Sequence, residues 1–237
     1  MFRLLFLTFF CLAISGVTLW WAFDDPTTDN AELHNDTQAQ IVARTKTAAE
    51  AGDRHAQYAL GEYLRDGVWL SVNKRKAFQM FFKSAQQSHP PAMVAVGRAY
   101  EDGEGVKRSF AKAAEWYLLA GRSFNSPEGQ YLLGQMYFSG KGVPHDYDEA
   151  HRWHAKAARN GHPGAQYLMG AMYESGWGVT LDNVKAYYWY HKALKQADEV
   201  KAIDKRYKPA DAIERLTSKM MSHELQKAKE IVARKIK

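Results

Sequence analysis

Histidines are the first candidates for chemistry in this sequence, because imidazole is a common ligand of transition metals. His151 and His154 are three residues apart and would share one face of a helix, and His145 and His162 lie nearby in the sequence. Zinc sites normally need three or four converging ligands, and the sequence contains no His-Glu-x-x-His motif. We therefore expect these histidines to be structural or surface residues rather than a metal site.

The sequence lacks the motifs of catalytic nucleophiles and cofactor-binding loops. It contains no Gly-x-Ser-x-Gly elbow and no Gly-x-x-x-x-Gly-Lys phosphate loop, and no carboxylate pair stands out from ordinary helix charge. The single cysteine, Cys11, leaves residues 24–237 without a disulfide, a thiolate ligand or a thiol nucleophile. We expect no enzymatic activity and no cofactor.

A pattern with a period of 36 to 37 residues runs through most of the chain. It is clearest in three Gly-x-Gly-Val sequences, at Gly103–Val106, Gly140–Val143 and Gly176–Val179. A further copy fits the same frame at Gly61 and Gly67. Tandem units of this length are typical of solenoids, in which each unit buries its apolar face against its neighbours.

Each unit has the apolar spacing of two helices. Its first half reads like residues 165–173 and its second like residues 186–193, both with apolar residues three and four apart. A glycine recurs inside each first helix, at Gly61, Gly97, Gly134 and Gly170. Because glycine costs about 1 kcal/mol there relative to alanine, we expect close backbone contact between the paired helices. The Gly-x-Gly-Val glycines are predicted to end the first helices.

These turns, together with the helix signature Ala-Gln-Tyr-Leu-x-Gly-x-Met-Tyr at Ala165–Tyr173, resemble the Sel-one-like repeat (SLR) family, which is related to the tetratricopeptide repeat. The resemblance covers about residues 41–197. It implies an all-α fold, a right-handed α/α solenoid of about four helix pairs with capping helices at both ends. The first unit departs from the pattern, because Trp69 stands where the other copies have their second glycine. The geometry of that turn is therefore open.

The chain divides into five predicted segments. They are a signal anchor or signal peptide (1–23), a flexible tether (24–40), an N-terminal capping helix (41–55), four repeats (56–197) and basic C-terminal capping helices (198–237). Ser222 is the expected N-cap of the last helix.

Residues 4–23 form an uncharged run of 20 residues between Arg3 and Asp24. Such a run can span a bilayer, and the positive residue before it favours a short cytoplasmic tail. We favour an uncleaved signal anchor in a bacterial inner membrane, with the solenoid facing the periplasm. A cleaved signal peptide, which would give a periplasmic or secreted protein, is the alternative.

The excess positive charge lies at the C-terminal end. Residues 201–237 contain 11 Lys and Arg against 5 Asp and Glu, which equals the +6 of the whole chain. This segment could contact anionic lipid or an acidic partner, but a solvated face on capping helices is the plainer interpretation. We expect no nucleic-acid partner, because the N-terminal segment indicates export.

A solenoid of this class implies a concave groove lined by its first helices. Counting from the mid-helix glycine, the candidate partner-binding residues are Tyr58, Glu62, Arg65, Arg98, Glu101, Tyr131, Gln135, Phe138, Tyr167 and Glu174. Tyrosine suits protein recognition, although these tyrosines could equally pack between neighbouring helices. Trp116, Trp153 and Trp189 recur in the second helices and are expected in the core.

The leading hypothesis is a membrane-anchored, extracytoplasmic adaptor that binds a protein partner through this groove. One alternative is a cell-envelope hydrolase or a factor associated with one, for which His151 and His154 would be the first residues to test. Another is a structural tether whose basic C-terminal segment contacts lipid.

Overall fold

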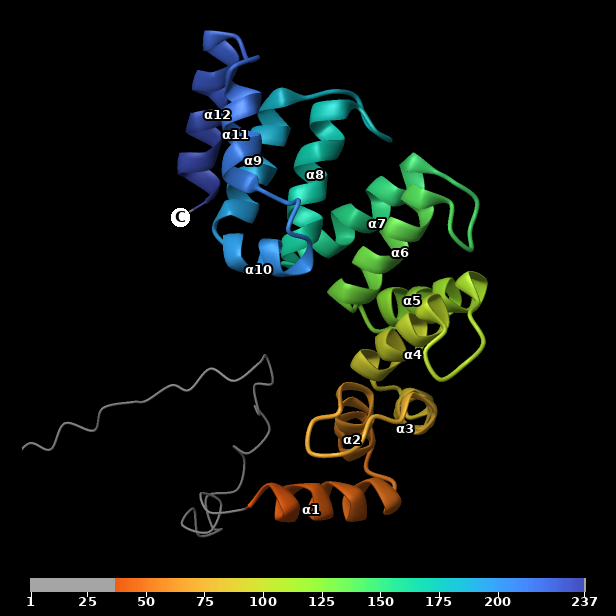
Figure 1. The fold of residues 1–237 in the computed structure, drawn as a ribbon. Helices are drawn as coiled ribbons and strands as arrows, with labels where there is room; N and C mark the ends of the chain where they lie inside the picture. The colour runs from red at the N-terminus through yellow and green to blue at the C-terminus, as the bar shows by residue number, and fades with distance from the viewer. Residues whose placement is uncertain (1–36, 237) are drawn as a thin grey trace, which may run out of the picture. The chain divides into compact units, whose positions relative to one another are not determined.

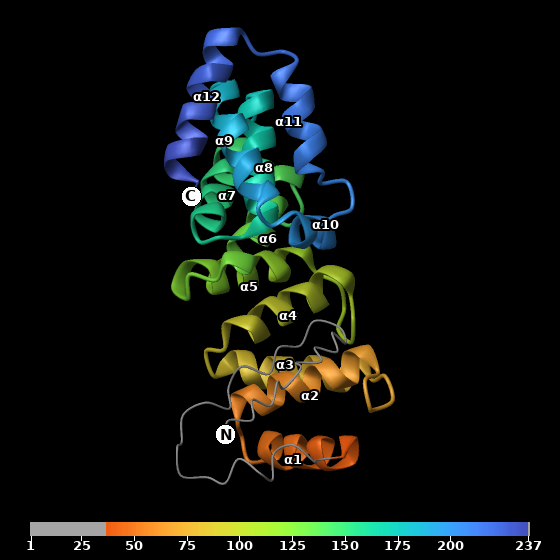
Figure 2. The ribbon, with the colours of Figure 1, turned by 90° about the vertical axis from the view of Figure 1, so that its left-hand side faces the viewer.

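The computed structural model describes residues 37–236 of the chain, and this part is all-helical, with no strand among the described residues. The helices are shown in Figures 1 and 2. They are α1 (Gln38–Glu50), α2 (Arg54–Asp66), α3 (Lys74–Gln86), α4 (Pro90–Asp102), α5 (Phe110–Ser123), α6 (Pro127–Ser139), α7 (Tyr147–Arg159), α8 (Pro163–Ser175), α9 (Asn183–Leu194), α10 (Ala197–Ile203), α11 (Pro209–Thr217) and α12 (Ser222–Lys235).

Eight of these helices form four consecutive pairs, and each pair is one repeat of the sequence pattern. The pairs are α2/α3, α4/α5, α6/α7 and α8/α9, numbered here as repeats 1 to 4. Each helix packs mainly on the helices before and after it in the chain, as Figure 1 shows. At the two ends, α1 packs on α2, while α11 and α12 both pack on α9. Helices α2, α4, α6 and α8 are the first helices, and the surface they form is called the first-helix face.

The starts of the helices follow from local sequence. Seven of the described helices begin after a polar side chain that accepts a hydrogen bond from a backbone N–H three residues later, which satisfies one of the unpaired donors of the first turn. These N-caps are Asp53, Asn73, Ser109, Ser126, Asp146, His162 and Asp182. Proline occupies the first helical position of α4, α6, α8 and α11, where its fixed φ fits and its missing N–H costs nothing.

The first helices end at a glycine in the left-handed conformation, as the sequence predicted; for example, Gly103 has φ 77°. The second glycine of each turn has a different role. A Cβ on Gly105 would lie 2.1 Å from the carbonyl oxygen of Lys74, at the start of the second helix of the preceding repeat. Gly142 and Gly178 meet the preceding repeat in the same way. These glycines therefore let one repeat contact the backbone of the last.

Trp69 settles the turn that the sequence left open. It adopts the same left-handed conformation as the second glycines, with φ 62°, and its ring packs against Tyr63 at 5.1 Å. Because a side chain occupies this space, no backbone can approach Trp69 as closely as Lys74 approaches Gly105. Trp69 is 43% exposed, so much of its ring lies at the surface of this turn.

The mid-helix glycines have a packing reason, but it is not the one predicted from the sequence. Each glycine contacts a ring from the second helix of its own repeat, rather than the backbone of that helix. A Cβ on Gly97 would lie 2.4 Å from the Tyr117 ring, and one on Gly134 would lie 2.7 Å from His154. The other pairs are Gly61 with Phe81 and Gly170 with Tyr190. The glycine creates room for a ring at the centre of each repeat.

The tryptophans of the second helices belong to the core, as expected. Trp153 is buried, and Trp116 and Trp189 are half-buried against the same clusters of alanine, methionine and tyrosine. Alanine dominates the positions between these rings, which allows the helices to approach closely.

Three predicted boundaries need correction. Helix α1 begins at Gln38, so the last residues assigned to the tether are helical. The C-terminal region contains a further short helix, α10. Ser222 is the first residue of α12 and not its N-cap; Met221 holds that position, and its N–H donates to Glu224 at 3.1 Å. The predicted signal anchor or signal peptide (1–23) and most of the tether lie outside the described residues, and no described helix is long and apolar enough to cross a membrane.

Candidate functional site

The predicted groove residues of repeat 1 lie on α2 and are paired with one another. The Tyr58 hydroxyl donates a hydrogen bond to Glu62 at 2.8 Å, and the Tyr58 ring packs on Phe81. Arg65 donates two hydrogen bonds to Asp66, each of 2.7 Å, and its guanidinium lies 5.7 Å from the centre of the Phe81 ring. Burial raises the pKa of Glu62, although the Tyr58 hydroxyl opposes this. Tyr58, Glu62 and Arg65 are all half-buried, so this part of the face remains open to solvent.

The residues of repeat 2 link the first helices to one another. Arg98 of α4 is exposed and forms an ion pair with Glu128 at the start of α6. The other oxygen of Glu128 lies 2.8 Å from His162 Nε2, at the start of α8. Burial alone would raise the pKa of Glu128, but the hydrogen bond from His162 and the charge of Arg98 hold it below its ordinary value. No sequence pattern indicated that Glu128 belongs to this surface.

His162 is a structural residue with a defined tautomer. Its Nδ1 accepts a hydrogen bond from the backbone N–H of Ala165 at 3.1 Å, which makes His162 the N-cap of α8. Since Nδ1 is an acceptor, Nε2 carries the proton and donates to Glu128. Both nitrogens are therefore satisfied within the chain, and His162 is only 6% exposed.

On repeats 3 and 4, the first-helix face is covered by the chain itself. The covering part is the closing segment, defined as residues 204–219, which includes the loop after α10 and all of α11. The Tyr207 ring stacks on Tyr167 at 4.6 Å, and its hydroxyl lies 3.4 Å from the Tyr131 hydroxyl and 3.2 Å from Gln135 Nε2. Tyr131, Gln135 and Tyr167 were predicted to bind a partner, but the structure shows them packed against this segment.

Glu174 at the end of α8 is likewise bound by the closing segment. Arg215 donates to both of its oxygens, at 2.7 and 3.1 Å, and Lys219 lies at 3.4 Å. The Tyr190 hydroxyl also donates to Glu174, at 2.8 Å. The Glu174 side chain is only 11% exposed; burial would raise its pKa, but these donors hold it below the ordinary value.

In each repeat, the residue four positions after the mid-helix glycine is related to the second-helix ring that contacts that glycine. Where that ring is a tyrosine, a glutamate accepts its hydroxyl, as Tyr190 donates to Glu174 and Tyr117 donates to Glu101 at 2.8 Å. Repeat 1 has Phe81 and Arg65 at the two positions, and repeat 3 has His154 and Phe138. Neither of those pairs can form the hydroxyl–carboxylate bond.

Phe138 contributes to a different contact from the one predicted. Its ring packs on Tyr147 at 5.1 Å and on Trp177 at 5.2 Å, so it belongs to an aromatic cluster at the turns between repeats 3 and 4. Tyr147 and Trp177 are 37% and 38% exposed. This cluster joins neighbouring repeats at their turns.

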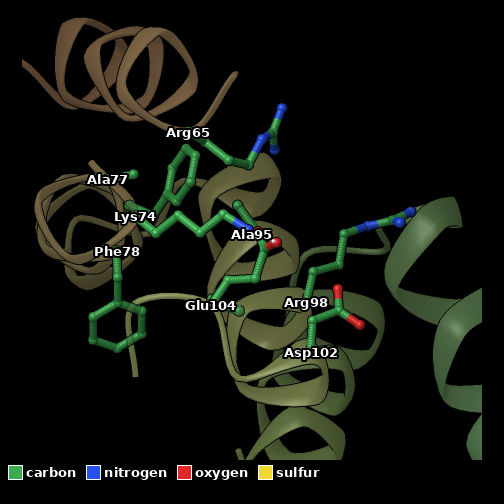
Figure 3. A pocket seen from close by; sticks show the side chains of 10 residues that line it. Arg65, Lys74, Ala77, Phe78, Ala95, Arg98, Asp102 and Glu104 are labelled. Carbon is green, nitrogen blue, oxygen red and sulfur yellow. Dashed lines mark hydrogen bonds and ion pairs between the residues drawn. The ribbon is translucent and has the colours of Figure 1, made fainter. Parts of the chain in front are cut away.

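The corresponding position between repeats 1 and 2 is a small cavity, shown in Figure 3. Its volume is about 210 Å³, below the few hundred Å³ typical of small-molecule sites. Lys74 reaches across it to an ion pair with Glu104, at 2.5 Å, while Arg98 extends away from it. Lys74, Glu104 and Arg65 occupy the positions that hold Tyr147, Trp177 and Phe138, respectively, in repeats 3 and 4. A cavity of this size suits one side chain better than a metabolite.

The histidines considered for metal binding have separate surroundings. His154 is 1% exposed beneath Gly134, neither of its nitrogens has a hydrogen-bond partner among the described residues, and burial lowers its pKa to about 3. His151 faces the edge of the Tyr173 ring, and His145 packs on Tyr147. Within residues 37–236, no three His, Cys, Asp or Glu side chains are grouped as metal ligands would be.

With this geometry in place, comparison with known proteins identifies the family. Residues 54–89, 90–123, 127–162 and 163–198 each match the Sel1 repeat, and together they make up more than half of the chain. The chain belongs to the Sel1 repeat family. The four matched spans correspond to the four helix pairs of the structure. Sel1 repeat proteins generally act as scaffolds for protein–protein interactions, and most are not enzymes.

Two solved structures show the same fold at useful similarity. One is c5321, a protective antigen of uropathogenic Escherichia coli with an SLR fold, at 35% identity and a TM-score of 0.63 over 68% of this chain and 34% of that one. The other is a Sel1 repeat protein from Oxalobacter formigenes, at 28% identity and a TM-score of 0.65 over 82% of this chain and 60% of that one.

Among curated proteins, Protein SHC1 of Saccharomyces cerevisiae (strain YJM789) is 29% identical over 105 residues. The match covers 44% of this chain and 20% of SHC1. The chain thus spans less than two thirds of these relatives, and the similarity lies in the shared repeats.

Proposed function

We propose that this Sel1 repeat protein is a membrane-anchored, extracytoplasmic scaffold that binds a protein partner through the first-helix face of repeats 1 and 2. The observation that carries the proposal is the closing segment. It covers the face on repeats 3 and 4 through ring stacking at Tyr167 and a two-point ion pair at Glu174. The face is therefore able to bind polypeptide. On repeats 1 and 2, where Tyr58, Glu62 and Glu101 are half-buried, the described chain provides no such cover.

The membrane-anchored part of the proposal rests on the sequence of residues 1–23. The apolar run after Arg3 and the acidic residues that follow it support an anchor with the repeats outside the cytoplasm. A reporter fused after Lys237, active only outside the cytoplasm, tests this orientation, and the mass of the mature N-terminus distinguishes an anchor from a cleaved signal. An inactive reporter on a fusion protein that is produced at full length would contradict the proposed location.

Site-specific photocrosslinking in cells tests the binding surface. A photoreactive residue placed at Tyr58 or Arg98 should give a discrete adduct with a partner protein. The same residue at Lys83 or Lys156, which are exposed on the second helices, provides the matched control. An adduct formed equally from both sets, or from neither, would remove the first-helix face of repeats 1 and 2 from the function.

The alternatives gain no support from a particular observation. His151 and His154 do not converge on a shared site, so they give no structural basis for a hydrolase. Part of the C-terminal basic charge is used within the chain, since Arg206 binds Asp204 and both Arg215 and Lys219 bind Glu174. We therefore give priority to the scaffold over lipid contact by residues 198–237.

A further inference from the structure

We propose that Glu101 binds an arginine or lysine side chain of the partner, and that the partner contacts the first helices α2 and α4 at the positions equivalent to those that Tyr207 and Arg215 contact on α6 and α8. This inference rests on the proposed function and specifies the chemistry of the partner. It follows from comparing two sites that are two repeats apart in the same chain.

The two sites use equivalent positions. The closing segment packs on α9 and also contacts four first-helix residues, each of which has a counterpart 73 residues earlier in the same place on a first helix. Tyr131 corresponds to Tyr58, Gln135 to Glu62, Tyr167 to Val94, and Glu174 to Glu101. The first-helix face therefore presents the same framework twice, once covered and once open.

The carboxylates of Glu174 and Glu101 have the same internal support but different external partners. Each accepts a hydrogen bond of 2.8 Å from the tyrosine beneath the mid-helix glycine of its repeat. Glu174 then receives Arg215 and Lys219. Among residues 37–236, Tyr117 is the one hydrogen-bond donor to Glu101, and no cation forms an ion pair with it. Glu101 is thus oriented by Tyr117 and keeps one oxygen available.

The neighbouring arginines do not fill this role, because both are engaged elsewhere. Arg65 makes two hydrogen bonds to Asp66, and Arg98 is paired with Glu128 of the next repeat. Two further carboxylates belong to this part of the face: Asp102, which is exposed and follows Glu101 in the chain, and Glu62, which lies 3.8 Å from Arg65 on α2. A guanidinium or ammonium group is the chemistry that complements this arrangement.

The differences between the two sites indicate which side chains the partner segment should carry. Glu62 replaces an amide by a carboxylate, so the open site carries more negative charge than the covered one. Val94, which is 6% exposed, replaces the stacking surface of Tyr167. We expect a partner segment that is basic and depends less on an aromatic ring than the closing segment does.

A peptide of this chain provides the test. The probe is a fluorescent peptide of residues 201–220, titrated against the full-length protein in detergent micelles. Binding should weaken about tenfold in the Glu101→Gln variant, since the amide keeps the Tyr117 hydrogen bond but loses the charge. Removal of Arg215 from the peptide should weaken binding to the wild type by a similar factor, with little further loss in Glu101→Gln.

The matched control is Glu174→Gln, which changes the equivalent residue of the covered site. Binding that is weakened by Glu174→Gln and not by Glu101→Gln would place the peptide on repeats 3 and 4 and overturn the inference. The absence of binding at millimolar peptide would overturn it as well. Either result leaves the proposed function standing if photocrosslinks persist at Tyr58 and Arg98, so the two proposals can fail separately.

Discussion

At the residue scale, the position beneath each mid-helix glycine sets the local chemistry of its repeat. The residues found there are Phe81, Tyr117, His154 and Tyr190. A tyrosine requires an acceptor for its buried hydroxyl, and a glutamate on the first helix provides it. The imidazole of His154 leaves two nitrogens without partners among the described residues, so repeat 3 is polar at this position without the compensating bond.

Exchanging these pairs tests the rule. His154→Tyr alone should destabilise the protein, because its hydroxyl would be buried facing Phe138 without an acceptor. Adding Phe138→Glu should produce the pair found in repeats 2 and 4. A double-mutant cycle from urea unfolding should give a favourable coupling of about 1–2 kcal/mol. Purely additive effects would show that the tyrosine–glutamate bond does not transfer between repeats.

Two buried histidines should make the protein sensitive to acid. Burial lowers the pKa of His89 to about 4 and that of His154 to about 3, from an ordinary value of 6.5. Below pH 6.5 the unfolded state therefore binds protons that the folded state does not. The stability that depends on these two neutral histidines should be fully present above pH 6.5. As the pH decreases from 6.5 towards 4, the free energy of unfolding should fall by about 1.4 kcal/mol per pH unit for each histidine.

Urea unfolding of His154→Phe checks the contribution of that residue. Phenylalanine already occupies the same position beneath Gly61 in repeat 1, so the variant should fold. Its free energy of unfolding should decline less steeply between pH 6.5 and 4 than that of the wild type. Parallel curves for the two proteins would mean that His154 protonates as readily in the fold as in the unfolded chain.

At the element scale, the turns show how one helix pair recognises the next. Gly142 and Gly161 both have positive φ, of 73° and 90°, yet only Gly142 contacts another repeat. A Cβ at Gly142 would lie 2.3 Å from the backbone of Phe110, whereas one at Gly161 would have no atom within 4 Å. Replacing each glycine by alanine therefore distinguishes two losses of stability. One comes from placing a side chain in the left-handed conformation, and the other from disrupting the contact between repeats.

The two alanine variants should therefore differ. Gly161→Ala should cost about 1 kcal/mol, because only the left-handed conformation is disfavoured. Gly142→Ala should cost about 3 kcal/mol or more, since the added methyl group would push repeats 2 and 3 apart. Chemical denaturation of both variants provides the comparison. Equal losses would indicate that the neighbouring backbone can move aside at no cost.

The sequence was sufficient for the regular parts of the elements and insufficient where distant segments meet. Helix period and turn glycines predicted the four pairs, because those signals are local. The ring beneath Gly97 comes from Tyr117, twenty residues later, so periodicity showed the glycine but not its neighbour. In repeats 2 and 4 a glutamate and a tyrosine occur together at equivalent positions, as Glu101 with Tyr117 and as Glu174 with Tyr190, and repeats 1 and 3 have neither. This shared occurrence was visible in the sequence and would have indicated the two pairs.

At the scale of the whole described unit, the C-terminal region both caps the array and covers a binding surface. Helices α11 and α12 pack on α9, while Tyr207 crosses to α6 and α8. No local sequence pattern indicates that residue 207 contacts residue 131, since such a contact depends on where the array ends. For this reason Tyr131, Gln135, Tyr167 and Glu174, which were predicted to bind a partner, contact the closing segment in the structure.

Loss of the Tyr207 ring should have a local effect. In a repeat array each unit contacts mainly its neighbours, so a defect at one end spreads little. In Tyr207→Ala, amide hydrogen exchange should accelerate in α10 and α11 and stay unchanged in α2 to α5. Mass spectrometry of exchanged peptides gives the answer, and faster exchange throughout repeats 1 and 2 would contradict this independence.

Trp69 has a consequence for how such an array can be lengthened. A duplicated unit inserted between existing repeats meets a glycine at the turn that must accept its backbone, so the copy can dock at once. A unit added ahead of Arg54 would meet the indole of Trp69 in that space, and the tryptophan would have to be replaced first. In an engineered array, a unit joined ahead of Arg54 should therefore dock only after Trp69 is replaced by glycine, whereas a unit inserted between later repeats should need no such change.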